Sequence, residues 1–325
     1  MNANLKITLI IVAVAAGAQG MSLVLPPYAS TLLLLMGINA LMAVSLNIVN
    51  GLSGQFSLGH AGFMAVGGYT AASVNTFLLS SWQGSAWSEQ AALLVSLLIG
   101  ALVTAFVGFL VGLPTLRLRG DYLAIVTLGF GEIIRVILLN IPAVGGARGM
   151  IGIPQSTTAF LVFLSLAAAV AAIHRWVKSH QGRAVLSVRE DEIAASCLGV
   201  NVTGYNVKAF VVSAALAGWA GGLFAHDFSY LNPSEFGFMK SVELVIMVVL
   251  GGLGSISGSV VAAFLLTLLP EALRPLQEWT GIDLRMVIYS LVLIGMMLVR
   301  PGGLFGRREL WQMDWKRKFG MRNSE

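Results

Sequence analysis

Glu132 and Arg135 are two charged residues inside an apolar stretch, residues 122–140, that is long enough to cross a membrane. Three positions apart on a helix, they would share a face and could form an ion pair. Charged groups at membrane depth are costly and usually face a bundle interior or a water-filled cavity. Two interpretations remain open: Glu132 lines a transport path, where it could relay protons, or the two residues form a structural pair.

A second group of polar residues joins two apolar segments, in the sequence GLSGQFSLGH at 51–60. Ser53, Gln55 and Ser57 supply neutral hydrogen-bonding groups, His60 adds an imidazole, and the glycines let the backbone approach a partner closely. We interpret this stretch either as a polar element at the cytoplasmic mouth of a transport path or as a tight turn between helices. For His60 alone, the pattern favours a packed, hydrogen-bonded side chain over a ligand.

Ser53 also lies in Gly-Leu-Ser-Gly, which resembles the serine turn of intramembrane proteases of the rhomboid kind. A serine nucleophile needs a base within hydrogen-bond reach. We expect His226 near the opposite end of its own span, and His60 would have to fold back from the start of the next helix. Proteolysis is therefore a competing hypothesis that the spacing does not favour.

The sequence contains none of the common motifs for ATP hydrolysis or metal binding. It has no G-x-x-x-x-G-K-[ST] phosphate loop, no C-x-x-C and no H-E-x-x-H, and its 4 histidines share no metal-ligand spacing. Its one cysteine, Cys197, excludes an intramolecular disulfide. We therefore predict a protein that is not an enzyme, needs no cofactor of its own and receives any ATP energy from a partner.

The composition of the chain is that of a membrane protein. Of 325 residues, 57% are hydrophobic and only 11% are charged, whereas about a quarter are charged in soluble domains. A membrane-spanning helix takes ~20 mostly apolar residues, so we predict an all-α, polytopic integral membrane protein with about 8–10 transmembrane helices. A soluble enzyme is excluded. The apolar segments are 7–25, 30–49, 58–79, 91–113, 122–140, 159–177, 209–228, 241–269 and 284–300.

The segment 241–269 is too long for one helix, and Gly251, Gly252 and Gly254 lie in its middle. We predict that the helix is broken near 251–255 and that both of its parts leave from the same side of the membrane. A break at membrane depth requires protein or a water-filled cavity to satisfy the freed backbone groups. Such breaks occur along transport paths, but small residues also allow close helix packing, and both interpretations stay open.

Most basic residues are predicted to lie on one side of the membrane, with the amino terminus, the 114–121 and 174–208 loops and the carboxyl terminus. They are Lys6, Arg117, Arg119, Arg175, Lys178, Arg183, Arg189, Lys208, Arg300, Arg307, Arg308, Lys316, Arg317, Lys318 and Arg322. The opposite side has only Arg148, Lys240, Arg274 and Arg285. The positive-inside rule makes the first side cytoplasmic, so the basic excess does not require a nucleic-acid partner. The first segment could be a signal peptide, but continued hydrophobicity to Leu25 favours a retained helix.

The loop from Lys178 to Lys208 is the most informative polar segment. Acidic residues at 190–192, followed by Ile193, Ala194, Ala195 and Leu198, predict a short amphipathic helix that ends at Gly199. Such a helix could bind in a groove on a soluble partner or rest on the lipid interface.

This loop resembles the cytoplasmic coupling loop of bacterial ABC importer permeases, which carries Glu-Ala-Ala, three residues and then Gly. Ala194, Ala195 and Gly199 fit that spacing, although Ile193 occupies the glutamate position and Glu192 lies one place early. Further stretches make the chain similar to the branched-chain amino-acid permease family. They are LSGQFSLGH at 52–60, RGDYLA at 119–124, GFGE at 129–132, GGLGS at 251–255 and RPGGLFG at 300–306.

The resemblance implies a multi-pass subunit of a heteromeric importer in the bacterial inner membrane, carrying branched-chain or other hydrophobic amino acids. Its partners would be a LivH-like permease, two cytoplasmic ATPases like LivG and LivF, which bind the ATP, and a periplasmic substrate-binding protein. Urea and short-amide importers use similar permeases and are an alternative. A proton-coupled secondary transporter that uses Glu132 is another.

We assign residues 1–306 to a transmembrane permease domain that includes the 178–208 coupling loop, and 307–325 to a basic cytoplasmic tail. The residues predicted to couple to the ATPases are Arg189, Glu190, Glu192, Ala194, Ala195 and Gly199. The candidates for the translocation path are Ser53, Gln55, Ser57, His60, Glu132, Gly251, Gly252 and Gly254.

Overall fold

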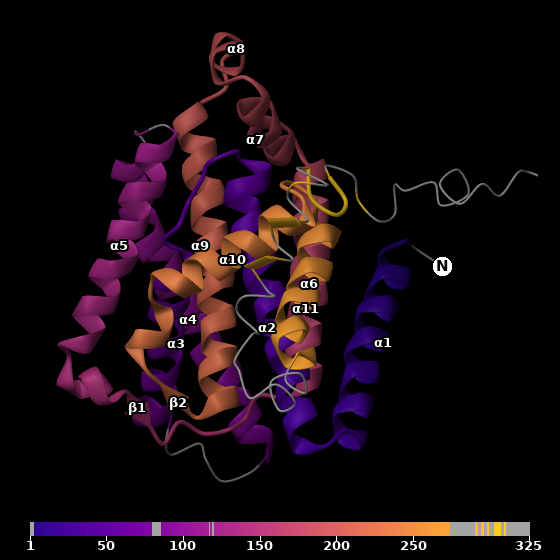
Figure 1. The fold of residues 1–325 in the computed structure, drawn as a ribbon, viewed down its shortest axis with the longest axis vertical. Helices are drawn as coiled ribbons and strands as arrows, with labels where there is room; N and C mark the ends of the chain where they lie inside the picture. The colour runs from indigo at the N-terminus through magenta and orange to yellow at the C-terminus, as the bar shows by residue number, and fades with distance from the viewer. Residues whose placement is uncertain are drawn as a thin grey trace, which may run out of the picture.

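The computed structural model describes residues 3–79, 86–116, 118, 120–273, 290, 291, 294, 295, 298, 302–306 and 309. Most of the predicted span 284–300 and of the 307–325 tail therefore lies outside the described residues, as do Arg117 and Arg119. Within the described part, helices run between two ends of an elongated bundle (Figure 1).

The α-helices are α1 (Ala3–Val24), α2 (Pro27–Asn47), α3 (His60–Ser73), α4 (Ala86–Thr115), α5 (Asp121–Leu139), α6 (Ala159–Lys178), α7 (His180–Glu190), α8 (Glu192–Cys197), α9 (Val202–Phe228), α10 (Phe238–Gly251) and α11 (Ile256–Ala272). Two π-helical turns, η1 (Ile48–Leu52) and η2 (Val74–Leu78), extend α2 and α3. Short 3-10 turns are η4 (Pro142–Val144), η5 (Gly146–Arg148) and η6 (Pro233–Phe236). The strands β1 (Met150–Ile151) and β2 (Tyr230–Leu231) form one antiparallel pair.

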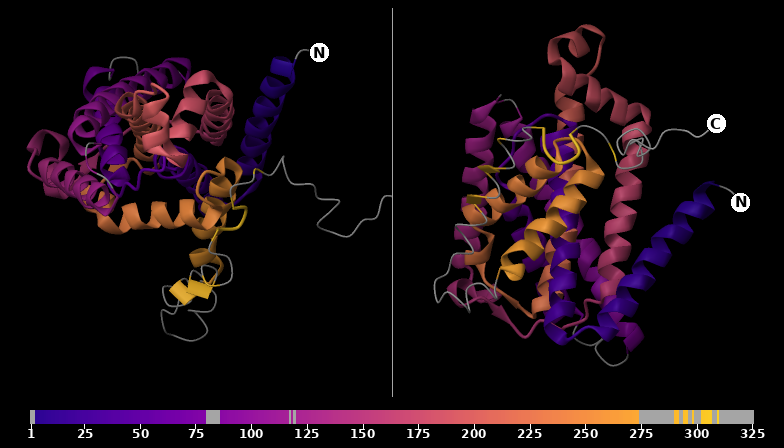
Figure 2. Two further views of the ribbon diagram at one scale, coloured as in Figure 1. Left: turned by 90° about the horizontal axis from the view of Figure 1, so that it is seen from above. Right: turned by 45° about the vertical axis from the view of Figure 1, so that its right-hand side comes forward.

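The prediction of an all-α, polytopic membrane protein is confirmed. Among the described residues, 5 helices are long and apolar enough to cross a membrane: Pro27–Leu52, Trp87–Thr115, Asp121–Leu139, Ala159–Lys178 and Val202–Phe228. The helices α1, α3 and α11 run alongside them in the same bundle, whereas α10 crosses the bundle obliquely (Figures 1 and 2). Helix α1 packs against α6, and Phe160 N donates a hydrogen bond of 2.9 Å to Gln19 Oε1.

The helices α3, α4 and α9 form the most closely packed part of the bundle. A methyl group at Gly67 of α3 would overlap the Cα atom of Gly218 in α9, and one at Gly221 would overlap the carbonyl oxygen of Met64. Membrane helices associate mainly through such close packing of small residues, because lipid offers no hydrophobic driving force between them. These glycines therefore bring α3 and α9 into backbone contact.

The two ends of the bundle differ. We call the end with α7 and α8 the inner end and the end with β1 and β2 the outer end (Figure 1). The described parts of the α4–α5 connection also lie at the inner end, as the distribution of basic residues predicts. Arg148, the last residue of η5, comes just before β1 and therefore lies at the outer end, again as predicted.

The predicted break in segment 241–269 is confirmed. Helix α10 ends at Gly251, and α11 begins at Ile256 after a turn in which Gly252 and Gly254 have φ angles of 110° and 90°. Only glycine adopts such angles without strain. The side chain of Ser255 then caps α11 by accepting a hydrogen bond of 3.1 Å from Gly258 N. The two helices consequently form a hairpin whose turn lies near the inner end (Figure 1).

Candidate functional site

The turn between α10 and α11 meets three other segments at the inner end. We call this meeting point the inner junction; it comprises residues 47–54, Arg189, residues 250–257, residues 302–306 and Glu309. Each of these segments contributes a hydrogen bond or a close contact that holds the broken helix in place.

Asn47, the last residue of α2, binds the turn with both ends of its amide. Its Oδ1 accepts a hydrogen bond of 2.9 Å from Gly254 N, and its Nδ2 donates one of 3.0 Å to Ser255 O. Asn47 is 1% exposed. A buried amide of this kind replaces the water that the freed backbone groups would otherwise need. We did not single out Asn47 from the sequence, although a polar residue at the end of an apolar run is the signal that could have identified it.

Arg189 connects the junction to α7. Its Nη1 donates a hydrogen bond of 2.9 Å to Gly51 O, and a methyl group at Gly254 would lie 2.9 Å from the same nitrogen. The carboxylate of Glu190 orients the guanidinium by accepting bonds of 2.6 Å from Nη2 and 3.2 Å from Nε. One side chain of α7 therefore touches both η1 and the glycine turn.

The carboxyl-terminal segment completes the junction. Leu304 N donates 2.8 Å to Leu250 O, and Glu309 accepts bonds of 2.8 Å from Ile256 N and 3.0 Å from Ser257 N. A carboxylate at a helix N-terminus satisfies otherwise unpaired N–H groups and opposes the helix dipole. The predicted domain boundary at 306 assigns Glu309 to the tail, whereas its side chain caps α11.

Three polar residues of the 51–60 stretch, Ser53, Ser57 and His60, are buried, and Gln55 is partly buried. Ser53 Oγ donates 2.8 Å to Val49 O, and His60 Nε2 lies 2.7 Å from Ser45 Oγ. Ser53 and His60 thus have different partners, which gives the protease hypothesis no support, and His60 is packed and hydrogen-bonded. Gln55 Oε1 and Ser57 Oγ are buried without a hydrogen-bond partner among the described residues.

The hydrogen-bond partners of the Glu132 carboxylate are not other path candidates. Its Oε2 accepts a hydrogen bond of 2.7 Å from Arg135 Nε, and its Oε1 accepts one of 3.1 Å from Phe238 N, the first residue of α10. The carboxylate therefore holds the start of α10, where an anion is favourable. This arrangement favours the structural pair over a proton relay. Four path candidates, Ser53, Gly251, Gly252 and Gly254, do lie together at the inner junction, whereas Gln55 and Ser57 belong to the connection that leads from it to α3.

The coupling loop differs from the prediction in one respect. We expected a single helix that includes Glu190, but Arg189 and Glu190 close α7, and Asp191 interrupts the chain with an extended backbone. The Asp191 carboxylate accepts hydrogen bonds of 2.9 Å from both Ile193 N and Ala194 N, so it caps a separate helix, α8. An N-cap requires non-helical backbone angles, which explains why one helix cannot continue through Asp191.

Helix α8 ends as predicted. Gly199 has a φ angle of 81°, Gly199 N bonds Ser196 O, and Val200 N bonds Ala195 O, which is the Schellman arrangement. Ala195 is buried, whereas Ile193 is 70% and Leu198 84% exposed. The helix stands beyond the bundle (Figure 1). Two of its large apolar side chains are therefore uncovered.

Loss of the Asp191 cap should weaken α8 without removing any residue from its exposed surface. We expect Asp191→Ala to destabilise the helix by about 1 kcal/mol, so the backbone amides of α8 should exchange with solvent about fivefold faster. Asp191→Asn should retain the wild-type exchange rates, because the asparagine oxygen accepts the same bonds. Hydrogen exchange would measure both, and equal rates for the alanine variant and the wild type would contradict a role for the cap.

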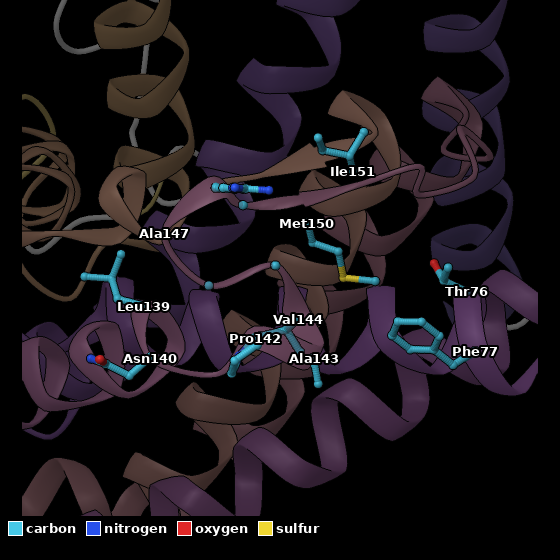
Figure 3. Close-up of a pocket in the computed structure, with 14 residues that line it drawn as sticks. Thr76, Phe77, Leu139, Asn140, Pro142, Ala143, Val144, Ala147, Met150 and Ile151 are labelled. Carbon is cyan, nitrogen blue, oxygen red and sulfur yellow. The ribbon is translucent and has the colours of Figure 1, made fainter.

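The outer end carries a cavity of about 760 Å³ (Figure 3). Thr76 and Phe77 of η2 line one side of it, and the connection from Leu139 to Ile151 lines the other (Figure 3). That connection turns at Gly145, Gly146 and Gly149, which all have positive φ angles. The outer end therefore presents a concave surface built from loops.

The bundle of apolar helices, the broken helix hairpin and the projecting α8 define a multi-pass membrane protein of the permease class. A family model described as branched-chain amino acid transport system / permease component matches residues 28–300. The chain belongs to this family.

Individual relatives agree with this assignment. The chain is 37% identical over 300 residues to the high-affinity branched-chain amino acid transport system permease protein LivM of Salmonella typhimurium and to that of Escherichia coli, with 81% of this chain and 67% of each relative covered. It is 25% identical to the permease protein LivH of Salmonella typhimurium over 287 residues, with 83% of this chain and 92% of LivH covered. The sequence motifs also indicate the LivM member. No solved structure matches the chain.

Proposed function

We propose that this chain is the permease subunit of an ABC importer that moves branched-chain amino acids inward across the bacterial inner membrane, with ATP hydrolysed by partner subunits. The observation that carries the proposal is the connection from α8 through Arg189 to the turn of the α10–α11 hairpin. The names of the LivM relatives support the substrate class.

The exposed surface of α8 would bind in a groove of a cytoplasmic ATPase. Ile193 and Leu198 would supply the apolar contacts, as amphipathic helices do in such grooves. Movement of α8 would be transmitted through α7 to Gly51 and Gly254, because Arg189 contacts both. A hairpin hinged at glycines can adopt two arrangements, and ATP binding by the partners would select between them.

Membership of the family supports a proposal for the remaining partners. We propose a second, LivH-like permease beside this chain, two ATPases like LivG and LivF at the inner end, and a periplasmic binding protein at the outer end. The concave surface from Leu139 to Ile151 is where the binding protein would release its substrate. Residues 1–306, together with Glu309, would form the permease domain. A urea or short-amide importer would use the same machinery and differ in its binding protein.

A charge on the exposed face of α8 should prevent ATPase binding. Burial of a leucine side chain contributes roughly 1.5–3 kcal/mol, so Leu198→Asp should lower the amount of ATPase that copurifies with the permease about tenfold or more. Ser187→Asp adds the same charge to α7 at an exposed position and is the matched control.

Reconstitution of the four-component assembly with the binding protein in vesicles tests the function itself. Uptake of radiolabelled leucine should require ATP and should fail with Leu198→Asp. Uptake by this chain alone, driven by a proton gradient, would overturn the proposal. Normal ATPase copurification with Leu198→Asp would remove α8 as the binding surface.

A further inference from the structure

A second cavity, of about 410 Å³, lies between the outer ends of several helices. Its walls come from α2, α3, α9, β2, η6 and α10. Most of its lining is apolar and includes several aromatic rings. The apolar residues that would contact a ligand are Leu35, Met64, Phe224, Phe228 and Phe236. The rings of Phe224 and Phe228 are 4.6 Å apart, and those of Phe224 and Phe236 are 5.9 Å apart. The size and lining are typical of a pocket for a small ligand.

Two opposite charges complete the lining, Lys240 at the start of α10 and Glu235 in η6. The Lys240 side chain is only 18% exposed, and its Nζ donates 3.0 Å to Glu243 Oε2 and 3.3 Å to Asn39 Oδ1. An ammonium has three N–H donors. Those two bonds therefore leave one donor for a ligand, within the part of the chain that the structure describes.

Glu235 supplies the opposite charge at the exposed rim of the cavity. Partial burial raises the pKa of its carboxyl, and the Lys240 ammonium, which lines the same cavity, opposes that rise. The turn that carries Glu235 is fixed by Asn232, whose Oδ1 accepts 2.9 Å from Ser234 N. An anion and a cation thus line the same apolar cavity from separate elements.

We infer that this cavity binds the zwitterion of an apolar amino acid, with its carboxylate at Lys240, its ammonium at Glu235 and its side chain against the phenylalanines. The inference rests on the proposed function and gives it a site in the outer half of the permease. A zwitterionic lipid headgroup, such as phosphatidylethanolamine, carries the same pair of charges and is the other source of this chemistry.

The position of Lys240 links the cavity to the inner junction. Lys240 and Gly251 lie on the same helix, α10, about 16 Å apart at 1.5 Å per residue. Glu235 lies outside that helix. A movement of the hairpin would therefore change the separation of the two charges, and a zwitterion held between them would be released.

Photolabelling tests the site directly. The probe is leucine with a diazirine in its side chain, applied to the assembled permease and ATPases without binding protein, in nanodiscs that lack phosphatidylethanolamine. We expect label on peptides from 224–240, displaced by leucine. Leucinol, which lacks the carboxylate, and 4-methylpentanoate, which lacks the ammonium, should each compete at least tenfold less well, because each loses a charge-assisted bond.

Single substitutions test the two charges one at a time, and a control variant shows whether a loss of labelling comes from the charge or from a change in the fold. Lys240→Gln and Glu235→Gln should each reduce labelling about tenfold. If Lys240→Gln prevents assembly because the Lys240 hydrogen bonds are lost, Glu235→Gln alone tests the inference. Met239→Ala, at an exposed neighbour that does not line the cavity, should label as the wild type does.

Three results would overturn the inference: label confined to other peptides, equal competition by the single-charge analogues, or displacement by phosphatidylethanolamine but not by leucine. Leucine uptake by the same preparation, measured with binding protein and ATP, distinguishes a failure of this inference from a failure of the proposed function. Uptake without cavity labelling would remove only this site, whereas absence of ATP-dependent uptake would remove the proposed function.

Discussion

Replacing Arg189 with alanine should reduce ATP-driven uptake roughly 100-fold while the ATPases remain bound and continue to hydrolyse ATP. The guanidinium donates a charge-assisted hydrogen bond to Gly51 O and contacts the turn at Gly254. Such a bond contributes roughly 1.5–3 kcal/mol. Since α8 is unchanged, ATPase binding should persist, and only the connection to the hairpin should be lost.

Arg183→Ala is the matched control for this experiment. Arg183 also lies on α7, but it is exposed, and its Nη1 donates 3.0 Å to Lys178 O at the end of α6, away from the inner junction. Its replacement should leave uptake within about twofold of the wild type, as surface substitutions usually do. Parallel measurement of uptake and ATP hydrolysis distinguishes uncoupling from loss of assembly. Equal uptake by the Arg189 and Arg183 variants would contradict transmission through Arg189.

Replacing Gly51 with alanine should destabilise the inner junction. The added methyl group would overlap Asn47 Oδ1 and the backbone nitrogen of Gly254, which are the two partners of one hydrogen bond. Overpacking costs about 1–3 kcal/mol, and the loss of a buried hydrogen bond adds to this. We expect a lower midpoint of thermal unfolding in detergent and little or no uptake.

Gly129→Ala provides the comparison. A methyl group at Gly129 of α5 would meet no atom within 4 Å, and alanine favours a helix over glycine by about 1 kcal/mol. This variant should therefore be at least as stable as the wild type. A Gly51 variant with the same unfolding midpoint as the Gly129 variant would show that the junction can accept a side chain.

The sequence alone predicted the features that depend on local chemistry. The break at 251–255 followed from three glycines in a segment too long for one helix, and the end of α8 followed from Gly199. The boundaries of α5 and α6 agree closely with the apolar segments 122–140 and 159–177, because span length is set by membrane thickness.

The junction itself could not be predicted. Asn47 and Gly254 are 207 positions apart, and Ile256 and Glu309 are 53 apart, so no local pattern connects them. Helix α7 was missed because its sequence is mostly polar, and the periodicity that reveals a helix depends on an apolar stripe. Without α7, the sequence predicted one helix from the acidic residues at 190–192 to Gly199. The separate roles of Arg189, at the end of α7, and of Asp191, at the start of α8, were therefore not recognised.

The backbone contact between α3 and α9 limits where the permease can deform. Where Gly67 faces Gly218, there is no layer of side chains that could rearrange as one helix slides along the other. Packed helices usually accommodate sliding through small rotations of interdigitated side chains. This pair would consequently act as a rigid frame, against which the proposed tilt of the α10–α11 hairpin would take place.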